Sequence, residues 1–124
     1  MFKRFAIGIA VLALVGACFT PSVPIPPPEP EDMAFEVDTD TNTVRFSHDA
    51  NVSYRGAVVY VFNRTQGVGL IVTANSDGSV SPTAPFAGGD GDQVVVTFEL
   101  ETQLAAVCVE IHDGQSSSAF ECEL

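Results

Sequence analysis

The chain has 124 residues and a mass of 13.1 kDa, which is enough for one domain and not two. Its five Lys and Arg are outnumbered by sixteen Asp and Glu, and the resulting formal charge of −11 argues against binding to nucleic-acid phosphates. Hydrophobic residues make up 46 % of the chain, too large a share for a disordered acidic polymer.

The N-terminus has the features of a secretion signal. Lys3 and Arg4 form a short positive start, and an apolar run over residues 5–15 follows. This run of about 11 residues is too short to span a bilayer, which needs ~20, but it fits the apolar region of a signal peptide. Two small residues and Cys18 come directly after it.

The segment Val15-Gly16-Ala17-Cys18 resembles the lipobox of bacterial lipoproteins. The resemblance implies cleavage between Ala17 and Cys18, so that residues 1–17 are the lipoprotein signal peptide and Cys18 carries the acyl chains. The membrane is then a partner through covalent lipid. Phe19, where an Asp would favour the inner membrane, implies an outer-membrane address. An ordinary signal peptide with a chance cysteine is the alternative.

Residues 18–32 are predicted to form a lipidated, proline-rich tether. Six of the eight prolines lie in this stretch. Proline fixes φ and removes a backbone donor, so we expect an extended polyproline-II stalk, reaching ~43 Å over fourteen residues. After cleavage three arginines and sixteen acidic residues remain, a formal charge of −13 that an anionic membrane surface repels.

Cys108 and Cys122 remain as an even pair in an oxidising compartment, which predicts a disulfide. Closing a loop of this length, about 15 residues, stabilises a domain by ~3 kcal/mol in the chain-entropy model. The alternative is a metal site or a reactive thiol, but the sequence has no CxxC motif and no Cys/His cluster to favour it.

Residues 33–124 show the short apolar runs and regular turn signals of a β-sandwich or barrel. Strands are expected at residues 34–37, 43–47, 57–63, 69–74, 79–81, 93–100, 104–111 and 119–122. Alternation predicts that Val94, Val96, Phe98 and Leu100 face inward. The 57–62 segment is apolar on both faces, which suits a central strand covered on both sides or lying against a loop.

A hairpin centred near Gln115 would place residue 108 directly opposite residue 122, within disulfide reach. In that register Glu121 shares a face with the inward-pointing Val109. We therefore expect the last strand to be a short edge strand, unless the register slips.

Residues 57–109 resemble a bacterial immunoglobulin-like module. The resemblance rests on turn and strand motifs at residues 63–67 (NRTQG), 74–79 (ANSDGS) and 91–95 (GDQVV). It implies an all-β, immunoglobulin-like antiparallel β-sandwich of about seven strands. The chain departs from the pattern by inserting Gln66 and by lacking an Asp-Gly-Asn turn after residue 100. These motifs indicate fold rather than activity.

One segment begins like a calcium loop. Asp38-x-Asp40-x-Asn42 has the alternating oxygens that a hard cation prefers, but Thr43 and Asp49 stand where Gly and Glu belong. A polar turn is the expected structure. Asp90 and Asp92 could supplement such a site from another loop.

Catalytic patterns are weak. His48 and His112 each precede an Asp, yet neighbouring residues on a strand point to opposite faces. Glu99 and Glu101 are predicted to share one strand face, as exposed strands commonly allow. We therefore predict no catalytic residue, no metal ligand and no cofactor.

The sequence thus predicts a lipid-anchored protein of the bacterial envelope with a non-enzymatic structural, adhesive or binding role. One alternative is an accessory lipoprotein of a secretion or pilus assembly. The other is a small metal-dependent binder or hydrolase.

Overall fold

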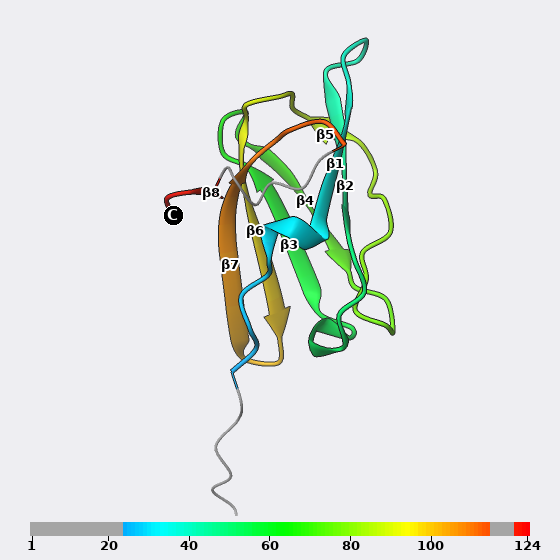
Figure 1. Ribbon diagram of the computed structural model, residues 1–124, viewed down its shortest axis with the longest axis vertical. Helices are drawn as coiled ribbons and strands as arrows, with labels where there is room; N and C mark the ends of the chain where they lie inside the picture. The colour runs from blue at the N-terminus through cyan, green and yellow to red at the C-terminus, as the bar shows by residue number, and fades with distance from the viewer. Residues whose placement is uncertain (1–23, 115–120) are drawn as a thin grey trace, which may run out of the picture.

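Two antiparallel sheets make up the fold in the computed structural model, which describes residues 24–114 and 121–124 (Figure 1). The strands are β1 (Met33–Asp38), β2 (Thr43–His48), β3 (Val58–Asn63), β4 (Val68–Thr73), β5 (Phe86–Ala87), β6 (Gln93–Leu100), β7 (Gln103–Glu110) and β8 (Glu121–Cys122). Two short 3₁₀ helices, η1 (Pro30–Asp32) and η2 (Val52–Tyr54), complete the elements. In these parts of the chain, no helix is long and apolar enough to cross a membrane.

The strand order is β1-β2-β5 in one sheet and β4-β3-β6-β7-β8 in the other. Every pair is antiparallel, and β1 and β2 run beside the layer formed by β3, β6 and β7 (Figure 1). Inward side chains from both sheets belong to one buried cluster. The predicted all-β, two-sheet architecture is confirmed at this level.

The core follows the alternation of the strands. Val94, Val96 and Phe98 are buried, and Leu100 packs against the same cluster, as predicted. The largest fully buried side chains are Tyr54, Phe35, Phe46, Phe98, Met33, Ile111, Val44, Val59, Val61, Val94, Val96 and Val109. Apolar burial on this scale, ~25 cal/mol per Å² of surface removed from water, is what holds a small domain together.

Most predicted strands agree with the structure within one or two residues, but two differences stand out. Residues 79–81 form no strand, and Val80 makes only an isolated bridge to His48. The short strand β5 was not predicted, because two residues paired with β2 carry no readable alternation. The 93–100 strand is confirmed with its bounds.

The outer side of β3 is only partly covered, whereas the sequence predicts a strand covered on both sides or lying against a loop. Val59 and Val61 point into the core, whereas Val58, Tyr60 and Phe62 alternate with them toward the outside. The Phe62 side chain is 46 % exposed. Val58 and Tyr60 are half-buried.

The C-terminal hairpin has the predicted register. Cys108 lies opposite Cys122, their Cα atoms are 5.0 Å apart, and a disulfide joins them. Val109 pairs with Glu121 on β8. Strand β8 is a short edge strand, as predicted from the acidic residue opposite Val109. Residues 115–120, including the centre of the predicted hairpin, lie outside the described residues.

The predicted signal peptide and Cys18, the predicted lipidation site, also lie outside the described residues, but the end of the predicted tether is within them. The Ile25 amide donates to Gln103 Oε1 at 2.6 Å, and the Tyr54 hydroxyl donates to the Pro26 carbonyl oxygen at 2.7 Å. Pro28 is buried and is followed by the helix η1. From residue 24 onward the segment is therefore docked on the domain through hydrogen bonds with its side chains, and over Pro30–Asp32 a 3₁₀ helix replaces the predicted extended stalk.

The Tyr54 contact makes the docked tether sensitive to alkaline pH. Burial, with smaller contributions from the charges of Glu29 and Asp32, raises the pKa of Tyr54 from 10 to about 12. The unfolded chain loses this proton at lower pH than the folded one, so the contribution of Tyr54 to stability is constant below pH 10 and falls as the pH rises toward 12. Urea unfolding at pH 9 and pH 11.5 measures the loss. A Tyr54→Phe variant should show a smaller loss over the same window, and an equal loss would contradict this assignment.

Candidate functional site

The β1–β2 hairpin ends in a polar turn whose geometry is set by Asp38. Asp38 Oδ1 accepts hydrogen bonds from the amides of Asp40 at 2.9 Å and Thr41 at 3.4 Å. Asn42 has a φ of 52°, in the left-handed region that asparagine tolerates better than most residues. The expected polar turn is confirmed. The Asp38 carboxylate, which would be the first ligand of a calcium loop, accepts hydrogen bonds from the backbone of the turn instead.

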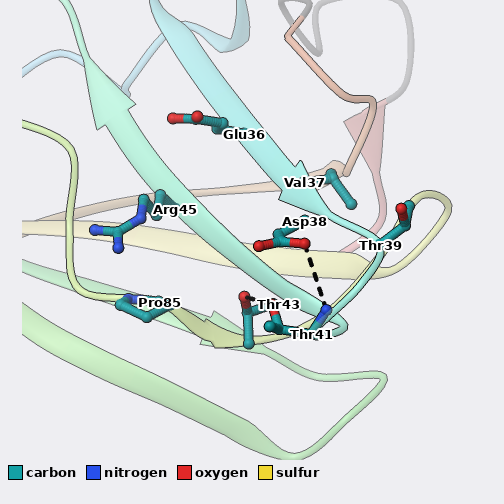
Figure 2. Close-up of a pocket in the computed structure, with 8 residues that line it drawn as sticks. All are labelled: Glu36, Val37, Asp38, Thr39, Thr41, Thr43, Arg45 and Pro85. Atoms are coloured by element: carbon teal, nitrogen blue, oxygen red, sulfur yellow. Dashed lines mark hydrogen bonds between the residues drawn. The ribbon is translucent and has the colours of Figure 1, made fainter.

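A polar hollow of about 560 Å³ lies on the outer face of this hairpin (Figure 2). It is lined by Glu36, Val37, Asp38, Thr39, Thr41, Thr43, Arg45 and Pro85. The register places Glu36 opposite Arg45 and Asp38 opposite Thr43, so that strand alternation alone brings these side chains to one face. Pro85 belongs to the segment that leads into β5.

Hydrogen bonds within the hollow orient some of its groups. Arg45 Nη1 donates to the Thr83 carbonyl oxygen at 3.1 Å, which ties β2 to the segment before β5. The hydroxyls of Thr41 and Thr43 lie 2.7 Å apart. Two carboxylates, one guanidinium and several hydroxyls therefore surround an open space. These groups donate and accept hydrogen bonds, which suits the binding of a polar ligand rich in hydroxyl groups.

The other acidic residues considered for a cation site are engaged elsewhere. Asp90 Oδ1 accepts from the Asp113 amide at 2.9 Å, and Asp92 Oδ2 accepts from Asn63 Nδ2 at 2.9 Å. Across residues 24–114 and 121–124, no group of three or more His, Cys, Asp or Glu side chains is placed to hold a metal ion. The structure does not bring Asp90 or Asp92 to the hollow that contains Asp38.

Asn63 is the centre of a network of hydrogen bonds. The sequence analysis named Asn63 only as part of the turn motif at residues 63–67 and did not predict this network. Its side-chain amide donates to the Ala87 carbonyl oxygen at 3.1 Å and to Asp92, while its Oδ1 accepts from the amides of Thr65 at 3.0 Å and Gln66 at 3.1 Å. Asn63 is completely buried. The turn motifs at 63–67 and 91–95, which are far apart in the sequence, thus meet through one asparagine.

We expect the Asn63→Ala substitution to lower the free energy of unfolding by about 2–4 kcal/mol, because it removes four hydrogen bonds made by a fully buried side chain. Urea denaturation measures the change. Asn75→Ala is the matched control. That asparagine is exposed and its amide donates to the hydroxyls of Ser79 and Ser81, so we expect a loss within about 0.5 kcal/mol. Similar losses for both variants would contradict the role assigned to Asn63.

The histidines occupy different environments. His48 is buried, its Nδ1 lies 2.6 Å from the Asp49 carbonyl oxygen, and its ring meets those of Tyr54 and Phe98 edge-on. His48 is therefore part of the core. His112 Nε2 lies 3.7 Å from Glu110 Oε2, near the end of β7.

The predicted carboxylate pair is not formed as expected. Glu99 is on β6, where the Tyr60 hydroxyl donates to its Oε1 at 3.4 Å. Glu101 follows the end of β6 in a turn and has a φ of 58°. The prediction that the two residues share one strand face is wrong, because the strand ends at Leu100 and the chain reverses through Glu101.

Comparison with known proteins does not assign the chain to a family. No protein-family model, no curated protein and no solved structure matches the chain.

Proposed function

We propose that this protein is a lipid-anchored component of a bacterial envelope whose immunoglobulin-like β-sandwich binds a polar ligand without chemical conversion. The lipobox-like segment ending at Cys18 and the disulfide between Cys108 and Cys122 support an extracytoplasmic, anchored location. The two antiparallel sheets and the turn motifs joined by Asn63 support the immunoglobulin-like assignment.

The single observation that carries the binding role is the placement of the polar hollow relative to the tether. The blue start of the described chain and the turn of the β1–β2 hairpin lie at opposite ends of the domain (Figure 1). With acyl chains on Cys18, only six residue steps separate the lipid from residue 24, a span of at most ~20 Å. The tether end then faces the membrane, and the hollow faces away from it, toward ligands in the surrounding space.

The ligand class follows from the lining groups. Glu36, Asp38 and Arg45 provide charged partners on one face, and the threonines add hydroxyls. The hydroxyl groups of a neutral ligand can donate to the carboxylates and accept from the guanidinium, so a ligand with many hydroxyl groups matches this mixture. We therefore propose a glycan of the envelope as the ligand.

Filling the hollow tests this proposal. Thr43→Tyr places a large side chain in the hollow, and Thr73→Tyr places the same side chain on the exposed edge strand β4 as the matched control. We expect the parent and Thr73→Tyr to sediment with purified cell-wall glycan, and Thr43→Tyr to bind at least about tenfold more weakly. Absence of binding by the parent, or equal weakening by both variants, would overturn the glycan-binding role.

A further inference from the structure

The polar hollow on the β1–β2 hairpin carries an unbalanced charge. Its lining includes the carboxylates of Glu36 and Asp38 but only one guanidinium, that of Arg45. Among the described residues, no ion pair joins Arg45 to either carboxylate, although the register places Glu36 directly opposite it. Even if Arg45 turned to neutralise one carboxylate, the other would keep its charge. The hollow is therefore negative as a whole.

Hydrogen bonds hold two of these three charged groups in place. Arg45 Nη1 donates to the Thr83 carbonyl oxygen at 3.1 Å, so the guanidinium is held toward the segment before β5. Asp38 Oδ1 accepts from two amides of its own turn. The side chains of Glu36, Asp38 and Arg45 lie on the same side of the hairpin (Figure 2). The carboxylate of Glu36 and the second oxygen of Asp38 are thus available to a ligand in the hollow.

The charge of the whole domain adds to that of the hollow. Residues 24–124 contain three arginines and all sixteen acidic residues. A domain of this charge repels anionic ligands and attracts cationic ones. Sugar hydroxyls form hydrogen bonds with the lining groups but leave the negative charge of the hollow uncompensated, whereas a protonated amine compensates it. Charge therefore favours a ligand that carries an ammonium group among its hydroxyls.

We propose that the hollow selects glycans with a free, protonated amino group, a preference that rests on the glycan-binding role proposed above. An ammonium group has three N–H donors and no acceptor, so it pairs with the carboxylates of Glu36 and Asp38. The hydroxyls of the same sugar pair with Thr41, Thr43 and Arg45. Acetylation of the amine removes its charge and leaves one N–H donor, so the N-acetylated sugar loses the charge-assisted hydrogen bonds.

Titration of the full chain in mild detergent with two labelled hexasaccharides tests this preference. One is a hexamer of glucosamine, and the other is the same hexamer with every amine acetylated. We expect the amine form to bind at least about fivefold more tightly in about 0.15 M salt at about pH 6. The difference should shrink in about 1 M salt, because salt screens the attraction between exposed charges. Equal binding of the two hexamers would overturn the preference for an amine.

Charge variants separate pairing in the hollow from the general attraction between an acidic protein and a cationic sugar. Glu36→Gln removes one carboxylate from the hollow, and we expect it to weaken binding of the amine hexamer at least about threefold. Glu101→Gln is the matched control, because it removes the same charge from the exposed turn between β6 and β7, at the opposite end of the domain from the β1–β2 turn (Figure 1). Equal weakening by the two substitutions would overturn the assignment to the hollow.

Filling the hollow gives a measurement that does not depend on charge. Thr43→Tyr should weaken binding of the amine hexamer as strongly as it weakens sedimentation with cell-wall glycan. Unchanged binding of the hexamer would place the amine elsewhere on the acidic surface and overturn the proposal.

Failure of the glycan-binding role itself gives a different result. A parent chain that binds neither hexamer and does not sediment with cell-wall glycan would overturn both proposals. A parent chain that sediments with cell-wall glycan but binds the two hexamers equally would overturn the amine preference alone.

Discussion

The Cys18→Ser variant is expected to be lost from the membrane fraction. Each buried CH₂ contributes about 0.8 kcal/mol to membrane attachment, so several acyl chains hold a protein effectively permanently, while a single chain holds it only marginally. Without them, the mature domain carries three arginines against sixteen acidic residues and is repelled by an anionic surface. Fractionation after carbonate washing measures the loss, and detergent extraction measures what remains.

Thr20→Ser is the control for this experiment, because it changes a neighbouring residue and keeps the lipobox-like segment. Intact mass of the membrane-extracted parent should show a chain that begins at Cys18, carries acyl groups and contains the Cys108–Cys122 bridge. If Cys18→Ser resisted carbonate yet dissolved in detergent as the parent does, attachment through this cysteine would be wrong. The proposed function would then lose its anchor.

Local patterns were sufficient to predict the elements that span several alternating residues. Strand β6 was placed correctly because its buried Val94, Val96 and Phe98 alternate with polar or less buried positions. The pairing of Cys108 with Cys122 followed from the length of a hairpin, which is also a local property. The polar turn after Asp38 followed from its asparagine and aspartate residues.

Contacts between distant residues were beyond the reach of such patterns. Ile25 meets Gln103 across 78 positions of sequence, and no periodicity in the proline-rich tether signals that its end is docked. The network around Asn63 likewise depends on two turns meeting in space. The polar hollow was missed because only the pairing of β1 with β2 brings Glu36 opposite Arg45. In each case the deciding interaction is tertiary, and the local sequence is compatible with other arrangements.

We expect Phe98→Ala to lower the free energy of unfolding strongly, because it removes a large side chain from the core between the two sheets. The Phe98 ring is fully buried on β6, its centroid lies 4.3 Å from that of Tyr54, and the His48 ring meets it at 5.1 Å. Removing the ring loses its transfer free energy and leaves a cavity, together worth about 3–5 kcal/mol. Urea denaturation gives the change in the free energy of unfolding.

Leu104→Ala is the control for this core substitution, because it also removes a large apolar side chain but from a position that is 64 % exposed. We expect it to cost less than about 1 kcal/mol. The contrast separates burial between the sheets from apolar character alone, since both residues belong to neighbouring strands of one sheet. Similar losses for the two variants would mean that the packing of Phe98 against Tyr54 and His48 does not hold the sheets together.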